Sequence, residues 1–180
     1  LDVNTYIKQK SDFPDPVNGV ISLSTSNKVY EIRGTIDLGN DRIVIDGDNI
    51  KLQGSYSSTD KIISDFSVSS LITSVNHGVD IEKLTLSSPN SSYILEVDGN
   101  GSQILSMKNV TLLLANDLLR VNDLNSVIIE GAALWSNFDN GILFEGDIPN
   151  VIVSKILMQS FTGVAIDLNG MTTKAIDISK

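Results

Sequence analysis

The sequence is short of several residue types, and each shortage excludes a class of protein. Among its 180 residues there is no cysteine, which excludes disulfides and thiolate metal sites. Its 13 Lys and Arg stand against 22 Asp and Glu, for a formal net charge of −9. This balance disfavours nucleic acid and anionic lipid as partners. No apolar run approaches the ~20 residues that span a bilayer, so we expect no membrane insertion.

Helical periodicity is also missing after Lys10, and charged residues make up only 19% of the chain. Gly, Asn, Asp and Ser recur at intervals, as they do where many tight turns are needed. These features predict an all-β protein. Because the chain begins at Leu1 and ends within a strand pattern, we expect it to be a processed product or a fragment of a longer chain.

What the chain does have is a repeat between residues 71 and 180. Three sets of alternating apolar positions recur with a period of about 23–25 residues, the signature of a solenoid. The first set contains Leu95, Leu119, Ile142 and Ile166; the second Val79, Leu105, Val127, Val151 and Ile176; the third Leu86, Leu112, Leu134 and Met158. Several short strands in each period predict a parallel β-helix, in which each coil stacks on the next.

The N-terminal part of the chain is predicted to be different. Residues 1–10 have Val3, Tyr6 and Ile7 on one side of a possible short helix, and two prolines follow in residues 12–18. We therefore expect residues 1–18 to form a cap and linker, or alternatively a disordered or partner-bound arm, and residues 19–180 to form the β-helix. Residues 55–70 are predicted to be a lateral loop or an elongated turn.

Two polar columns are the candidates for chemistry. The outward column is Glu96, Arg120, Leu143 and Asp167. Because an apolar residue interrupts it and the arginine adjoins Glu96, an ion pair between coils is the better interpretation than a catalytic acid pair. The turn column is Asp98, Asn122, Glu145 and Asn169. It is interpreted as a ladder of turn residues, with a calcium site as the alternative.

The single histidine, His77, lies in an Asn-His-Gly turn with no nucleophile at a meaningful spacing. We therefore predict no catalytic, cofactor or metal site, and no cofactor. A different cluster has the character of a contact surface, namely Trp135, Phe138 and Asp139. Alternation directs Leu134 inward and Trp135 outward, and an exposed tryptophan indicates contact with a glycan or with another subunit, or packing under a lateral loop.

Residues 29–54, VYEIRGTIDLGNDRIVIDGDNIKLQG, resemble the opening coils of pectate-lyase-like proteins, which are right-handed, single-stranded parallel β-helices. The likeness is greatest to phage virion proteins such as tail spikes, fibres and other receptor-binding parts. The resemblance implies a virion or extracellular location and a homotrimer or other virion subunits as partners. It does not imply one function, because this fold carries enzymes, adhesins and inert shafts.

From these observations we expect a non-enzymatic part of a phage virion or another extracellular assembly, whose job is structural support or attachment to a host-surface glycan. Two alternatives remain open. One is a polysaccharide lyase or glycoside hydrolase of the same superfamily, which would need a cluster of carboxylates in an outer groove. The other is a bacterial surface adhesin built on the same coil.

Overall fold

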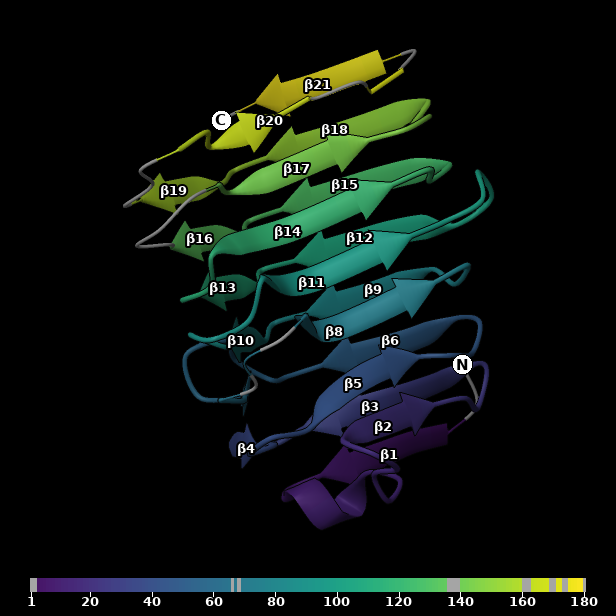
Figure 1. Cartoon of the computed structure of the whole chain (residues 1–180), viewed down its shortest axis with the longest axis vertical. Coiled ribbons are helices and arrows are strands. Elements are labelled where there is room, and N and C mark those ends of the chain that lie inside the picture. Colours follow the sequence, from purple (N-terminus) through teal and green to yellow (C-terminus); the bar gives the residue numbers. More distant parts are fainter. Residues whose placement is uncertain are drawn as a thin grey trace.

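The structure is a computed structural model that describes residues 3–65, 67, 69–135, 140–159, 163–168, 171–172 and 175–179. The described residues form three parallel sheets, and each complete coil of the chain contributes one strand to each of them. The coils stack into a column of about seven turns, from β1 (Val3–Ile7) at one end to β21 (Ala175–Ser179) at the other (Figure 1). The predicted all-β parallel β-helix is therefore confirmed.

The eight-stranded sheet contains β1 (Val3–Ile7), β3 (Lys28–Ile32), β6 (Ile50–Gln53), β9 (Val79–Glu82), β12 (Ile104–Lys108), β15 (Ser126–Glu130), β18 (Asn150–Ser154) and β21 (Ala175–Ser179). The seven-stranded sheet contains β2 (Val20–Leu23), β5 (Arg42–Ile45), β8 (Ser70–Val75), β11 (Tyr93–Asp98), β14 (Asp117–Asn122), β17 (Ile142–Glu145) and β20 (Ile166–Asp167). The six-stranded sheet contains β4 (Thr35–Asp37), β7 (Lys61–Ile63), β10 (Thr85–Ser87), β13 (Thr111–Leu113), β16 (Ala133–Trp135) and β19 (Leu157–Gln159).

The register of the strands matches the columns predicted from the sequence. Leu95 pairs with Leu119, which pairs with Ile142, which in turn pairs with Ile166. The other two inward columns pair in the same way in the eight-stranded and six-stranded sheets. Because side chains alternate across a strand, this register sends every apolar column into the space that the three sheets enclose.

The interior is filled by these columns and excludes water over most of the length of the column. Phe144, Leu112 and Leu134, for example, have no exposed surface. Several corners between strands have a left-handed backbone conformation, which asparagine tolerates better than most residues. Asn27 and Asn49 have φ values of 59° and 55° and directly precede β3 and β6. The Asn49 side chain donates a hydrogen bond to that of Asn27 in the preceding coil, at 2.9 Å.

The short helix predicted within residues 1–10 is wrong. Val3–Ile7 is the strand β1, which pairs along its length with β3 of the first complete coil. The neighbouring strand supplies backbone hydrogen-bond partners that the isolated segment lacks, and Ile7 becomes fully buried. The 3₁₀ helix η1 (Lys10–Asp12) follows, and Phe13 packs against Tyr30 with ring centroids 6.2 Å apart.

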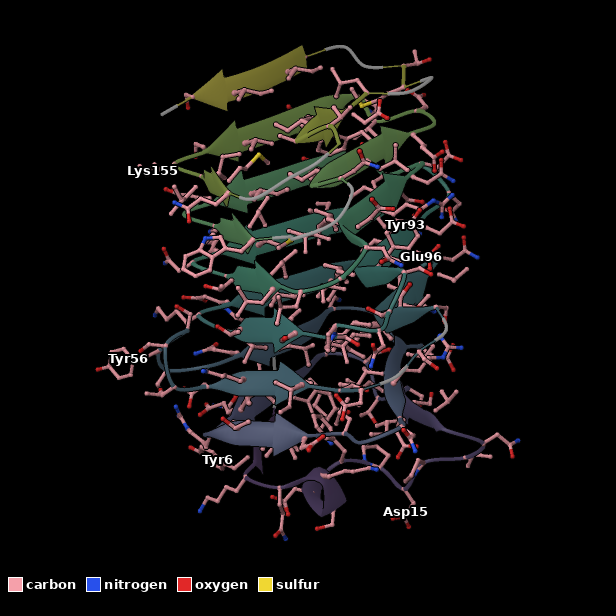
Figure 2. The ribbon with its side chains drawn as sticks, turned by 60° about the vertical axis from the view of Figure 1, so that its left-hand side comes forward. Tyr6, Asp15, Tyr56, Tyr93, Glu96 and Lys155 are labelled. Carbon is pink, nitrogen blue, oxygen red and sulfur yellow. The ribbon has the colours of Figure 1, made fainter. Side chains whose placement is uncertain are left out.

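A lateral loop, residues 54–60, interrupts the passage from β6 to β7. The loop is anchored by Asp60, a residue that is only 5% exposed. Its carboxylate accepts hydrogen bonds from the backbone N–H groups of Gly34, Ser55 and Tyr56. Burial raises the pKa of Asp60, but these hydrogen bonds and the nearby Arg33 outweigh burial and hold it below its ordinary value. The loop directs Tyr56 away from the column, 71% exposed (Figure 2).

Within the described residues, no helix is both long and apolar enough to cross a bilayer.

Candidate functional site

A groove of about 730 Å³ crosses the outer face of the eight-stranded sheet at β6, β9 and β12. One wall is the turn that carries Asp48 and Asn49, and the other is the turn that carries Ser102 and Gln103. Lys51, Asp80 and Ser106 occupy one outward column of the sheet and form its floor. The sequence patterns did not predict this groove.

The second wall is held in place by Gln103. Its side-chain Oε1 accepts hydrogen bonds from the backbone N–H groups of Asn100 and Ser102, and its Nε2 donates to the carbonyl of Asn76 in the preceding coil. Ile104, at the start of β12, adds a 47% exposed apolar surface beside it. The wall is therefore preorganised by hydrogen bonds within the protein.

The lysine of the groove is already paired with carboxylates. The Lys51 ammonium lies 2.6 Å from a carboxylate oxygen of Glu82 and 3.4 Å from one of Asp80. Burial lowers the pKa of Lys51, but these two carboxylates outweigh it, and the net shift is upward. The hydrogen bond from Lys51 is also the main cause that lowers the pKa of Glu82. Besides these paired groups and the exposed carboxylate of Asp48, the groove offers a ligand amide, hydroxyl and short apolar groups.

His77 lies at one end of the groove, next to Gly78 of its lining. Its Nδ1 atom is 2.8 Å from Oδ1 of Asp48, and its Nε2 atom is 3.9 Å from Oδ1 of Asp46. Both aspartates belong to the turn of the preceding coil. The histidine therefore joins two successive turns, in keeping with the structural role predicted from its Asn-His-Gly context.

A second polar cluster lies on the outer face of the seven-stranded sheet, where Arg120 joins three coils. Its Nη1 atom lies 2.9 Å from Oε1 of Glu96 in β11, and its Nε atom lies 2.7 Å from Oε2 of Glu145 in β17. Ser70 in β8 donates a hydrogen bond to the other carboxylate oxygen of Glu96, at 2.8 Å. The predicted ion pair between Glu96 and Arg120 is confirmed.

Tyr93 lies near Glu96 on the same strand (Figure 2). Burial raises the pKa of the Tyr93 hydroxyl, and the negative charge of Asp117 raises it further. Burial lowers the pKa of Arg120, but its bonds to Glu145 and Glu96 reverse the sign of the shift. The cluster therefore keeps a positive charge between two negative ones, which is the arrangement of a structural clamp.

The outward and turn columns have the predicted neighbours. Arg120 pairs with Leu143, and Leu143 with Asp167, along the outward column. In the turn column Asn122 donates a hydrogen bond to Asp98, at 2.6 Å, which fits the predicted ladder of turn residues. Glu145 belongs to this ladder by register, but its carboxylate turns back to Arg120. Asn169, the last member of the column, lies outside the described residues.

Trp135 is 44% exposed, and its neighbour Leu134 is fully buried, as the alternation along β16 predicted. Phe138 and Asp139, which we predicted to share a contact surface with Trp135, lie outside the described residues. Of the three predicted contact residues, the structure therefore places Trp135 alone, on the outer face of the six-stranded sheet.

Among the side chains that the structure describes, no group of three or more histidines and carboxylates is arranged to hold a metal ion.

No family model matches the chain, and no curated protein or solved structure matches it either. What the structure establishes is a parallel β-helix with a preorganised polar groove, an arginine clamp and an exposed tryptophan.

Proposed function

We propose that this chain is a structural or host-attachment part of a phage virion and that it binds a neutral glycan of the host surface in the groove over β6, β9 and β12. The phage origin and the extracellular or virion location rest on the resemblance of residues 29–54 to virion β-helices. The groove supplies the chemistry of attachment.

The groove carries the proposal because of how its charges are arranged. A volume of about 730 Å³ falls within the range of about 300–1,000 Å³ that is usual for ligand pockets. Lys51 is held by Glu82 and Asp80, so an anionic ligand such as an acidic polysaccharide finds no free positive charge on it, and Asp48 is hydrogen-bonded to His77. Amide and hydroxyl groups such as Asn49 and Ser106 suit the hydroxyl groups of a sugar, which both donate and accept hydrogen bonds.

The coils around the groove supply a firm support. Backbone ladders join every coil to the next, and the ion pairs Lys51–Glu82, Arg120–Glu145 and Lys155–Glu130 add links between coils on the outside. A binding site on strands is held more precisely than one on free loops. The same continuity suits a load-bearing part of an assembly, in which we propose that several copies, a trimer by the resemblance, act together.

The experiment that tests glycan binding places a bulky side chain in the floor of the groove. Ser106→Tyr should weaken binding to a panel of neutral surface polysaccharides by about tenfold or more, measured by calorimetry. Ser154→Tyr, an outward position of the same sheet that does not line the groove, should change the affinity by less than about twofold. Equal affinities for the two variants, or no binding by any polysaccharide of the panel, would contradict the proposal.

A further inference from the structure

The outer face of the six-stranded sheet is uncharged over its last three strands. The outward positions of β13, β16 and β19 are Thr111, Leu113, Ala133, Trp135, Leu157 and Gln159. The equivalent stretch of the seven-stranded sheet, by contrast, carries Arg120, Glu145 and Asp167. The chain has a formal charge of −9, so an outer sheet face without charged side chains differs from the charged face of the seven-stranded sheet.

Three large apolar side chains on this face, with Leu114 at the corner directly after β13, form what we call the apolar stripe: Leu113, Leu114, Trp135 and Leu157. Trp135 is 44% exposed, Leu157 48% and Leu114 38%. The three strands are hydrogen-bonded neighbours, so the stripe is continuous across successive coils. The backbone N–H of Leu114 also donates to the carbonyl of Trp135, at 3.1 Å, which holds these two residues side by side.

Leu114 adds an independent observation, because its backbone is in an unfavourable conformation for leucine. Its φ is 56°, in the left-handed region. The other non-glycine residues with positive φ in the described part of the chain are Asn, Asp or Lys. Asparagine would fit this corner with less strain. The protein therefore keeps an exposed apolar side chain at a cost in backbone energy, which indicates a role outside folding.

We propose that the apolar stripe is the surface on which a second copy of this chain docks. An acidic chain repels its own copies, and an uncharged face is where two copies can meet without bringing like charges together. A partner with a net positive charge could dock on any acidic face of the chain, so an uncharged face would give it no advantage. Aromatic residues are enriched and charged residues depleted at the centres of protein interfaces, as they are here. The inference rests on the proposal that the chain is a subunit of an assembly, and it names the face used.

Trp135 is the single tryptophan of the chain and reports on this face without a label. The molecular mass from analytical ultracentrifugation and the tryptophan emission are measured over the same range of protein concentrations. We expect the mass to rise with concentration. Over the same range the tryptophan emission should move to shorter wavelength, and the Trp135 ring should become less accessible to the quencher acrylamide. A mass that rises while the emission and quenching stay constant would show assembly through another face and would overturn the inference, but not the proposed function.

Two matched variants test the stripe itself. Leu114→Asn removes an apolar side chain at a corner whose backbone conformation asparagine adopts with less strain, and an unchanged Tm of the variant shows that the fold is intact. The variant should raise the concentration of half-association by about tenfold or more. Val75→Asn removes a 50% exposed valine from the seven-stranded sheet and should change the concentration of half-association by less than about twofold. Equal effects of the two variants, a monomer at every concentration, or a change in tryptophan emission caused by a polysaccharide instead of by concentration, would each overturn the inference.

Discussion

Replacing Arg120 by alanine tests whether the ion pairs on the outside of the coils stabilise the column. The guanidinium now lies 2.9 Å from Glu96 and 2.7 Å from Glu145, and its side chain is 23% exposed. Arg120→Ala removes both bonds and leaves the two glutamates on either side of an alanine. Their negative charges, previously separated by a positive one, would then repel each other across one intervening strand.

The expected loss in the free energy of unfolding is about 2 kcal/mol. It lies between the about 0.2–1 kcal/mol of an exposed ion pair and the about 3–5 kcal/mol of breaking a buried one, because the three side chains are partly exposed. For a chain of this size a loss of about 2 kcal/mol corresponds to a fall in Tm of about 4–8 °C. The difference should shrink in high salt, since salt screens charges that face water.

Thermal unfolding followed by circular dichroism at low and high salt measures this loss. The control is Lys155→Ala, because Lys155 and Glu130 are also joined between coils, at 3.0 Å, but are 67% and 44% exposed. The control should lose no more than about 1 kcal/mol. If Arg120→Ala unfolds within about 1 °C of the wild-type protein, or loses no more than the control, the assignment of a stabilising clamp is refuted.

Two further predictions concern the lateral loop and the core. Asp60→Asn should cost about 1–3 kcal/mol at pH 7 in urea unfolding, because buried N–H groups lose a charged acceptor. Since folding lowers the pKa of Asp60, the stability it contributes is present above its unfolded pKa and is lost as the pH falls through its folded pKa. The difference between wild type and variant should therefore narrow below about pH 4, and a constant difference down to pH 2 would count against the loop anchor. Phe144→Ala should cost about 3–5 kcal/mol by the same assay, because this ring is fully buried. Leu143→Ala, on the outward side of β17, should cost less than about 1 kcal/mol, and similar losses for the two variants would contradict the assigned register.

The repeated part of the fold was predictable because its signal is redundant. Leu95, Leu119 and Ile142 occupy one column in successive coils, so each coil confirms the register of the next. The first ten residues carry no such repetition. The spacing of Tyr6 and Ile7 fits a helix as well as a strand. The segment becomes a strand because it pairs with β3, and that partner cannot be read from residues 1–10 alone.

The surface features were predictable only in part. The alternation of inward and outward residues along a strand predicted that Trp135 lies on the outside. The register between neighbouring strands predicted that Glu96 lies next to Arg120. The bond from Arg120 to Glu145 is diagonal between coils, so a column-by-column comparison misses it. The groove depends on the direction in which the turn at Gln103 projects from the column, which hydrogen bonds between coils decide.

Incubation of the purified protein with neutral and anionic surface polysaccharides, with bound and released sugars measured in the same sample, tests the central claim most directly. An attachment protein should retain a neutral polysaccharide and leave its chain length unchanged, and Ser106→Tyr should weaken the retention by about tenfold or more. Release of oligosaccharides from any polysaccharide would contradict the account, and would direct attention to the carboxylates around Arg120 as candidate acids.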